Sequence, residues 1–199
     1  MYKLLALGAL ALAVPFAFRA TAVPASAAPT SAAAPWKVDE GHSSVVFRVK
    51  HFYAPFWGRF DKVSGSVQWD AAKPEAAAVE LSIDAGSVNT NDAKRDDHLR
   101  GPDFFDVKQF PKASFKSTKV VPDGESKMKV DGDLTLHGVT KPISFVVEKT
   151  GSVDDPKFGK KTGFHATLVV KRSEFGITYM KGGLGEDVEF MVSLEANEG

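Results

Sequence analysis

The segment Arg95–Pro111, RDDHLRGPDFFDVKQFP, is the most informative stretch of this chain for its fold. Its first six residues are dense in charge, which is typical of a solvated helix, and Gly101-Pro102 marks where that helix should end. Phe104 and Phe105 follow directly and need an apolar surface to cover. Because the chain on both sides is patterned as β-strands, the segment predicts a short helical lid, near residues 91–100, over the opening of a barrel.

Apolar and polar residues alternate through most of the chain. One run places Val45, Phe47 and Val49 on the face opposite Arg48 and Lys50. Seven further runs have the same period of two, at residues 63–69, 79–83, 113–115, 128–136, 143–147, 164–170 and 188–194. Such runs predict about eight antiparallel strands with one apolar face each, and this pattern fits a sandwich as well as a closed barrel.

The N-terminal region has the pattern of a secretory signal peptide, residues 1–27. Lys3 precedes an apolar run that ends at Phe18, and Ala25-Ser26-Ala27 offers a cleavage site. The run is shorter than the ~20 residues that a spanning helix needs, although a retained N-terminal anchor is the alternative. Residues 28–35 read as a flexible leader and 36–198 as a single domain, so we expect an exported, periplasmic protein.

The composition excludes several classes of function. The chain carries 25 basic and 25 acidic residues and no cysteine. Without a basic stripe or a polybasic patch, we expect no nucleic-acid partner and no strong attachment to anionic lipid. The absence of cysteine excludes disulfides, thiol chemistry and the usual lipoprotein anchor, so the fold must be stabilised by its core.

From Trp36 to Ala196 the chain resembles the YceI-like family, through motifs that occur in the family's order. They are Trp36-x-Val38-Asp39-x-x-His42-Ser43-x-Val45-x-Phe47-x-Val49-x-His51, Gly58-x-Phe60, Gly65-x-Val67, Arg95-Asp96-x-His98-Leu99-x-x-x-Asp103-Phe104-Phe105, Phe110-Pro111, Gly132-x-Leu134-Thr135-Leu136-His137-Gly138-Val139-Thr140-x-Pro142, Arg172-Ser173-x-Phe175-Gly176-Ile177 and Asp187-Val188. The resemblance implies an all-β, eight-stranded antiparallel lipocalin-like barrel. It also implies an exported protein that binds a polyisoprenoid or similar long-chain lipid and is a carrier, not an enzyme.

The chain departs from the family pattern at residues 52–57, FYAPFW, which are more aromatic than usual. Pro55 cannot donate a hydrogen bond to a neighbouring strand, so we expect it to break or bend the strand there. This difference could reshape the rim of the cavity. Glu174, where the family commonly has Asp, is a minor change.

The inward-facing apolar residues are the candidate lipid-binding site, with the alternative that most of them only fill a core. The candidates are Phe47, Val49, His51, Leu81, Ile83, Leu99, Phe104, Phe105, Phe115, Leu134, Leu136, Phe145, Phe164, Leu168 and Phe190. We expect no cofactor other than this bound lipid.

The polar residues of the lid, Arg95, Asp96, His98 and Arg100, have two interpretations. They could hold a lipid head group, or they could clamp the lid and satisfy the helix dipole, which we favour. An enzyme that acts on such a lipid, with His98 or His51 as acid or base, is the alternative function. An interaction module with a solid core is the third.

Five histidines raise the question of a metal, but none has the spacing of a zinc site, so we expect no metal and no catalytic residue. The remaining partner expectations are a transient contact with a membrane or lipid donor and a homodimer. The sequence pattern identifies neither surface.

Overall fold

The computed structural model describes residues 35–70, 73 and 76–198. The predicted signal peptide, and all of the predicted leader except Pro35, lie outside these residues. Within the described part of the chain, no helix is long and apolar enough to cross a membrane.

The described residues form a single sheet of antiparallel strands with one α-helix, α1 (Ala93–Arg100), and two 3₁₀ turns, η2 (Ala85–Ser87) and η3 (Arg172–Phe175). The strands are β1 (Trp36–Val38), β2 (Ser44–His51), β3 (Ala54–Phe60), β4 (Val63–Gln68), β5 (Ala78–Asp84), β6 (Val88–Asn89), β7 (Lys112–Pro122), β8 (Lys127–Leu136), β9 (Val139–Asp155), β10 (Gly159–Lys171) and β11 (Leu184–Glu198).

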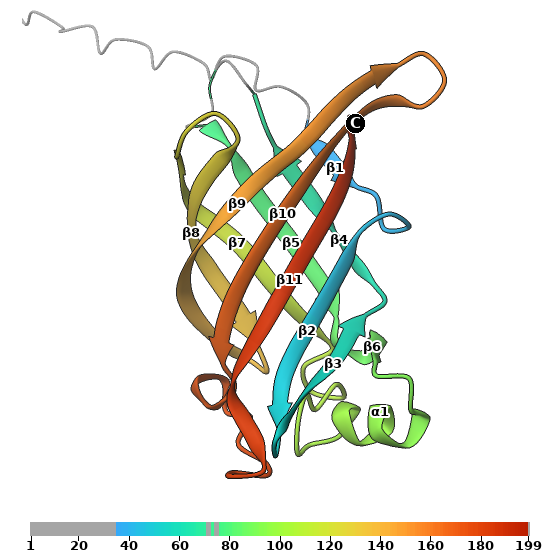
Figure 1. Cartoon of the computed structure of the whole chain (residues 1–199), viewed down its shortest axis with the longest axis vertical. Coiled ribbons are helices and arrows are strands. Elements are labelled where there is room, and N and C mark those ends of the chain that lie inside the picture. Colours follow the sequence, from blue (N-terminus) through green and yellow to red (C-terminus); the bar gives the residue numbers. More distant parts are fainter. Residues whose placement is uncertain (1–34, 71–72, 74–75, 199) are drawn as a thin grey trace, which may run out of the picture. The chain divides into compact units, whose positions relative to one another are not determined.

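The sheet closes on itself because β1 pairs with β11 as well as with β4. The short strand β1 and the longer β2 lie along the same edge of β11, where Val38 pairs with Ala196 and Ser44 with Ser193, so they act as one interrupted strand. In the same way, β4 pairs with β1 and β3 pairs with β2, so β3 and β4 together form the neighbouring strand of the ring. The result is a closed eight-stranded antiparallel barrel (Figure 1), which confirms the predicted fold and excludes the sandwich.

The alternating pattern of the strands separates the barrel interior from its outer surface. On β2, for example, Val45, Phe47 and Val49 are buried, whereas Arg48 points outward and forms a 2.7 Å ion pair with Glu189 of β11. The same alternation on the other strands gives a continuous apolar core inside the ring.

The helix α1 lies at the lower end of the barrel in Figure 1, next to β6. Asp92 is its N-cap, and the Asp92 carboxylate accepts a 2.8 Å hydrogen bond from the backbone N–H of Arg95. The helix therefore begins at Ala93, two residues after the predicted start at residue 91, and neither Thr90 nor Asn91 is its cap. Thr90 is instead engaged by a side chain from inside the helix, as described below, and Asn91 has a positive φ of 62°.

Three strands, β1, β3 and β6, did not stand out in the sequence. Pro55 was expected to break or bend its strand, but it lies within β3 and pairs with Lys50 of β2. The proline is tolerated because only Arg59 and Phe60 pair with β6 on the other edge of β3. No second ladder is therefore interrupted at Pro55.

Candidate functional site

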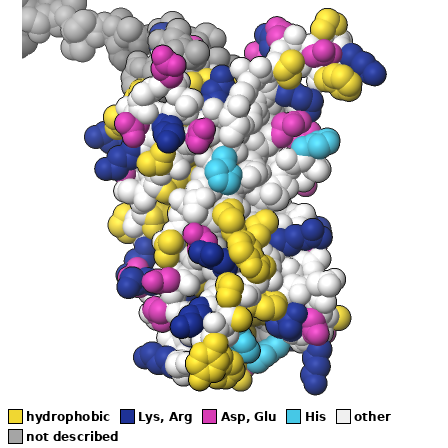
Figure 2. All heavy atoms as spheres, in the orientation of Figure 1, with side chains coloured by type: hydrophobic (Ala, Val, Ile, Leu, Met, Phe, Trp, Pro, Cys, Tyr) yellow, Lys and Arg dark blue, Asp and Glu magenta, His cyan; other side chains and the backbone are white. Residues whose placement is uncertain are grey.

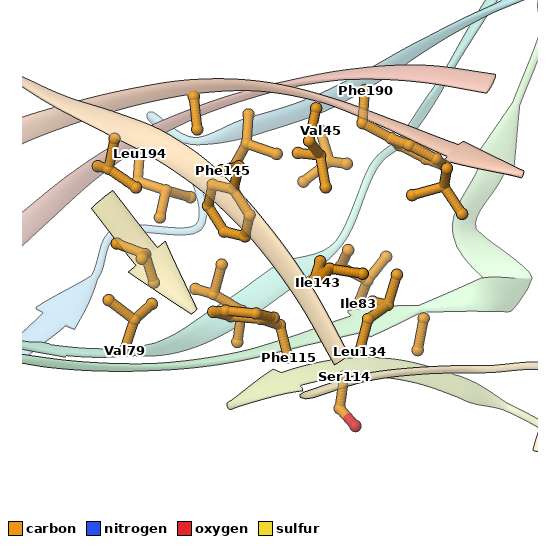
Figure 3. Close-up of a pocket in the computed structure, with 18 of the residues that line it drawn as sticks. Val45, Val79, Ile83, Ser114, Phe115, Leu134, Ile143, Phe145, Phe190 and Leu194 are labelled. Atoms are coloured by element: carbon orange, nitrogen blue, oxygen red, sulfur yellow. The ribbon is translucent and has the colours of Figure 1, made fainter. Parts of the chain in front are cut away.

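A cavity of about 110 Å³, the barrel cavity, lies inside the ring of strands. Strands from all around the ring contribute to its wall, which consists of Val45, Phe60, Val67, Val79, Leu81, Ile83, Phe105, Ala113, Ser114, Phe115, Val130, Leu134, Leu136, Ile143, Phe145, Val147, Phe164, His165, Ala166, Leu168, Val170, Phe190, Val192 and Leu194. The hydroxyl of Ser114 points away from the interior (Figure 3), and the His165 ring is directed to the exposed hydroxyl of Ser193. The cavity surface is therefore formed by aliphatic and aromatic groups.

Strand register brings the large side chains of this cavity together. Phe115 of β7 is paired with Leu81 of β5 on one side and with Leu134 of β8 on the other. Its ring also meets that of Phe145, with 5.2 Å between the ring centroids (Figure 3). Gly132 leaves the space for the Phe115 ring, because a Cβ atom at Gly132 would overlap it. The aromatic packing in this region thus depends on one glycine.

A second cavity, the end cavity, has a volume of about 70 Å³ and lies at the end of the barrel near α1. Its wall consists of Phe47, Val49, Leu99, Phe104, Phe105, Leu136, Val170, Arg172, Ile177, Leu184, Val188 and Phe190. Three of these, Leu99, Phe104 and Phe105, belong to the lid segment, which we define as residues 90–111. The lid segment thus contributes apolar side chains to the interior at this end.

The two cavities are separated by side chains that belong to both walls. Phe105, Leu136, Val170 and Phe190 line both spaces. The Phe105 ring packs edge-on against Phe60 with 5.4 Å between their centroids. We call these four residues the partition between the two cavities.

Both cavities are small for a ligand site. Each is smaller than the ~150 Å³ cavity that accommodates one benzene, and well below the ~300–1,000 Å³ of typical ligand pockets. The barrel is therefore closed around a nearly filled interior in this structure.

The predicted polar residues of the lid segment hold the lid segment itself. Arg95 donates to the Thr90 hydroxyl and carbonyl, at 2.8 and 2.9 Å, and its guanidinium lies 4.5 Å from the centre of the Phe56 ring. The buried carboxylate of Asp96 accepts from the Thr90 N–H at 2.8 Å and from its hydroxyl at 2.5 Å. These contacts connect α1 to the residues just before it and to β3.

The other two predicted lid residues act in the same region. Arg100 donates to the carbonyls of Gly86 and Val88, at 2.8 and 3.1 Å. His98 is 2.8 Å from the Asp103 carboxylate, and its ring packs edge-on against Phe104. None of Arg95, Asp96, His98 and Arg100 is in the wall of either cavity.

His51 was expected to face the cavity, and this placement is wrong. It is exposed, lies in neither wall, and packs edge-on against Phe52 with 4.8 Å between the ring centroids. The reason is that His51 is the last residue of β2. Its partner on β11 is Leu184, and the pairing of the two strands is irregular between Leu184 and Val188, the partner of Val49. The inward alternation that holds for Phe47 and Val49 therefore does not extend to residue 51.

The structure places the other predicted apolar residues in cavity walls. Leu81, Ile83, Phe115, Leu134, Phe145, Phe164 and Leu168 line the barrel cavity, Phe47, Val49, Leu99 and Phe104 line the end cavity, and Phe105, Leu136 and Phe190 line both. Their contact with a lipid stays a prediction.

Arg172 is a wall residue that the sequence analysis did not single out. It begins η3 and is only 4% exposed. Its guanidinium donates to the carbonyls of Gly185 (2.9 Å), Ile177 (3.1 Å), Tyr179 (2.7 Å) and Leu184 (3.2 Å). It therefore fixes the loop between η3 and β11, which borders the end cavity. The motif that begins at Arg172 could have indicated a structural role for this residue. However, an arginine that follows a strand is normally predicted to be exposed to solvent.

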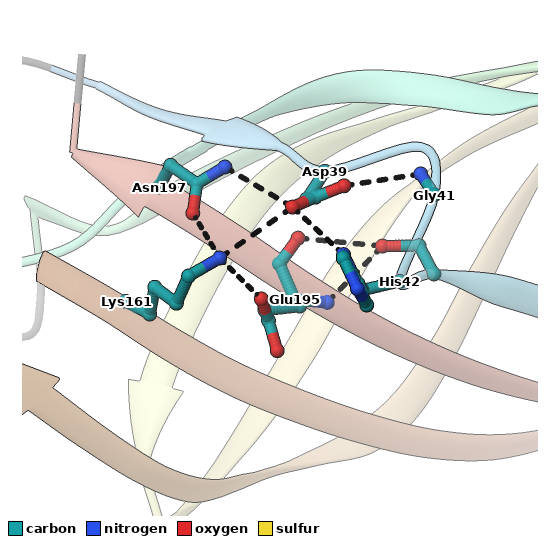
Figure 4. A network of polar contacts seen from close by, with 7 residues as sticks. Asp39, Gly41, His42, Lys161, Glu195 and Asn197 are labelled. Carbon is teal, nitrogen blue, oxygen red and sulfur yellow. Dashed lines mark hydrogen bonds and ion pairs between the residues drawn. The ribbon is translucent and has the colours of Figure 1, made fainter. Parts of the chain in front are cut away.

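A polar network joins the β1–β2 turn to β10 and β11 (Figure 4). Lys161 Nζ lies 2.6 Å from the Glu195 carboxylate and 3.5 Å from that of Asp39. Hydrogen bonds from His42 and then Asn197 lower the pKa of Asp39 from 3.8 to about 2. The hydrogen bond to Glu195 raises the pKa of Lys161.

Part of this network has the composition of a metal site. Candidate ligand atoms of Asp39, His42 and Glu195 lie within 4.8 Å of one another. However, the Lys161 ammonium contacts both carboxylates and supplies the positive charge that they need. We therefore interpret the group as an ion-pair network that fastens the barrel where its first and last strands meet.

Comparisons with known proteins agree with this architecture. The profile of the family described as "YceI-like domain" matches residues 36–196. A UPF0312 protein of Pseudomonas aeruginosa (strain LESB58) is 41% identical over 166 residues, which are 82% of this chain and 86% of that protein. The crystal structure of Burkholderia cenocepacia BcnA matches with a TM-score of 0.73 at 29% identity, over 80% of this chain and 99% of BcnA.

A more distant neighbour shares the fold. It is described as a polyisoprenoid binding domain from Saccharophagus degradans, implicated in plant cell wall breakdown. It has a TM-score of 0.64 and 18% identity, over 83% of this chain and 99% of that domain.

Proposed function

Because this chain belongs to the YceI-like family, we propose that it is an exported protein that binds a long-chain apolar lipid of the polyisoprenoid type inside its barrel. The observation that carries the proposal is the pair of adjoining cavities with apolar walls inside a closed ring of strands. The description of the Saccharophagus degradans neighbour as a polyisoprenoid binding domain supports the ligand class.

Cavities of about 110 and 70 Å³ are too small for a polyisoprenoid chain, so the interior must widen to bind one. One isoprene unit transferred from water is worth roughly 3–4 kcal/mol, at about 0.8 kcal/mol per buried CH₂. Moving one side chain away from its preferred rotamer costs about 0.5–1.5 kcal/mol. Relative to lipid dispersed in water, a chain of several units inside the barrel is therefore stabilised by more than the rotation of the partition residues Phe105 and Phe190 costs, and we propose that these rings move to admit the chain.

We further propose that the protein is a carrier, not an enzyme. Transfer from a membrane into the barrel exchanges one apolar environment for another, so uptake and release can be nearly balanced. Within the described residues, the charged side chain in the cavity walls is that of Arg172, whose hydrogen bonds go to backbone carbonyls. His98 and His51, the candidate acid–base groups, lie in neither wall.

Native mass spectrometry tests the central claim. The full chain is exported in a bacterial host, purified without detergent, and analysed in native and then denaturing conditions. We expect a stoichiometric hydrophobic species that is released on denaturation. A protein that arrives empty, and stays empty when offered polyprenols, would contradict lipid binding.

Matched tryptophan substitutions then locate the site. Phe145→Trp and Leu136→Trp fill the interior, whereas Val146→Trp adds the same ring on the outer face of β9, where Val146 is 45% exposed. We expect the two interior variants to fold and to lose the lipid, and Val146→Trp to retain it. Unchanged retention in both interior variants would overturn the assignment of the cavity.

The small cavity volumes favour one alternative, an interaction module with a solid core. It predicts that the interior variants change stability but that no variant carries lipid. The same mass spectra distinguish this module from the carrier.

A further inference from the structure

The tip of the β2–β3 hairpin carries two exposed aromatic side chains. Phe52 and Tyr53 connect His51 to Ala54, and they are 51% and 96% exposed. Figure 2 shows hydrophobic side chains gathered at this lower end of the barrel, beside histidine and flanked by lysine and arginine. Tyr53 contributes little to the stability of the fold, and because it adjoins the exposed Phe52 the two rings form a contiguous apolar surface of the kind that marks an interaction site.

Backbone conformation sets this tip apart from other turns. Among the described residues, five that are not glycine have a positive φ, and three of them are Asn91, Asp106 and His137, the types that tolerate this region. The other two are Phe52 (φ 49°) and Met180 (φ 58°). A large apolar residue at such a position is unfavourable, and this kind of strain is concentrated at functional sites.

These two strained residues lie in one assembly. The Phe52 N–H donates to the Gly183 carbonyl at 2.7 Å, and the N–H groups of Gly183 and Leu184 donate to the Met180 carbonyl. A Cβ atom added at Gly183 would touch the side chains of both Phe52 and Met180. The hairpin tip is therefore packed on the loop before β11. We call Phe52 and Tyr53, together with Met180 that supports them, the aromatic tip.

The aromatic tip is next to the end cavity. Leu184, which follows the Met180–Gly183 turn, lines that cavity, and Arg172 holds the same loop through the carbonyls of Tyr179 and Leu184. The lid segment, which supplies Phe104 and Phe105 to the cavity, lies at the same end of the barrel (Figure 1). A ligand that enters through this end would pass close to the tip.

Two basic residues adjoin the aromatic tip in the sequence. Lys50 and Lys181 are exposed on either side of it, and in the described part of the chain neither forms an ion pair with an acidic side chain. Aromatic rings flanked by lysine are the composition that binds the interface of a bilayer containing anionic lipid. Two basic groups give weak, reversible attachment, which suits a protein that must leave again.

We propose that the aromatic tip docks on the surface of a phospholipid bilayer, so that the end of the barrel with the lid segment faces the membrane from which lipid is loaded. This inference rests on the proposed lipid-binding function and adds the surface and the orientation. Phe52 and Tyr53 enter the headgroup region, and Lys50 and Lys181 contact anionic lipid phosphates.

Vesicle flotation tests the docking surface. The full mature protein is mixed with vesicles of phosphatidylethanolamine and phosphatidylglycerol, and the bound fraction is measured for wild type, Phe52→Ser/Tyr53→Ser and Phe158→Ser. Phe158 is the control for position, because this 62% exposed phenylalanine also has a lysine beside it, with Lys157 Nζ 5.0 Å from its ring centre, but it lies in the β9–β10 hairpin at the opposite end of the barrel (Figure 1). We expect the double variant to partition at least about tenfold more weakly, since two aromatic rings leave the interface, and the control to match wild type.

A second measurement tests the docking surface even if the variant Phe52→Ser/Tyr53→Ser does not fold. Tyr53→Trp and Phe158→Trp are compared with wild type, which has three tryptophans, for quenching by brominated lipids, and we expect Tyr53→Trp alone to show more quenched fluorescence than wild type. Equal flotation of wild type and the double variant, equal quenching at the two positions, or no flotation of wild type would each overturn the inference.

Failure of the docking surface and failure of lipid binding give different results. If lipid is found by native mass spectrometry but wild type does not float, the docking surface is wrong and the proposed function stands. If wild type floats through the aromatic tip but never carries lipid, the proposed function is wrong and the docking surface stands.

Discussion

Replacing Arg172 by methionine tests whether one buried guanidinium holds the end of the barrel together. The side chain is 4% exposed and donates to four backbone carbonyls, from Ile177 to Gly185. Methionine fills a similar length but donates to none of them. We therefore expect Arg172→Met to destabilise the protein and to loosen the loop that borders the end cavity.

The size of the effect follows from the contacts. Hydrogen bonds to charged groups contribute about 1.5–3 kcal/mol each, so four of them set an upper limit of about 6–12 kcal/mol. Part of this is recovered, because the charge no longer has to be desolvated and carbonyls near the surface, such as that of Tyr179, can bind water. We expect a net loss of about 3–5 kcal/mol, a large part of the ~5–15 kcal/mol that stabilises a typical domain.

Urea unfolding followed by tryptophan fluorescence measures this loss, and Arg48→Met is its control. Arg48 forms one ion pair with Glu189 on the outer face, with 44% of the side chain exposed, so the same substitution there should cost less than about 1 kcal/mol. Amide exchange of the loop between η3 and β11 should accelerate in Arg172→Met alone. If Arg172→Met stays within about 1 kcal/mol of wild type and the loop exchanges at the wild-type rate, the assigned role is wrong.

Three further predictions concern other parts of the barrel. The pKa of Asp39 is about 2 in the folded protein against an ordinary 3.8, so the stabilising effect of its ionised form is complete above about pH 4 and is lost as the pH falls through 2. The difference in unfolding free energy between wild type and Asp39→Asn should therefore shrink between pH 4 and pH 2. A difference that stays constant over this range would contradict the role of the ionised network. Gly132→Ala should cost about 1–3 kcal/mol, because the new methyl group would overlap the Phe115 ring, whereas Gly151→Ala has no atom within 4 Å and should be tolerated; equal melting temperatures would refute this packing argument. Arg95→Ala removes two hydrogen bonds from the lid segment, so exchange of bound lipid should become about tenfold faster, and a wild-type exchange rate together with a wild-type melting temperature would exclude the clamp.

The sequence was sufficient to predict the long strands because their burial repeats every two residues. Runs such as Met128–Leu136 and Phe164–Val170 correspond to strands whose apolar positions face the barrel interior. The choice of a barrel over a sandwich came from the family resemblance, since both architectures bury one face of each strand. Strands of two or three residues, such as β1 and β6, are too short to show a period.

The site was less predictable where it depends on the ends of strands or on distant pairing. The position of His51 depends on where β2 stops pairing regularly with β11, which the alternation does not indicate. Arg172 is buried because loop carbonyls converge on it, and these carbonyls carry no side-chain signal. Lys161 meets Glu195 through the pairing of β10 with β11, but it meets Asp39 only because the ring closes and brings the two ends of the domain together.

The pairing of β1 with β11 determines when this protein can finish folding. Trp36 lies opposite Glu198, and β11 also pairs with β2 and β10, so the barrel strand that is synthesised after all the others is needed by three of them. Contacts between such distant residues form slowly, because the long intervening loop must close first. The ring therefore cannot close until β11 has been synthesised, so the barrel must form after translation of nearly the whole domain and not strand by strand during it.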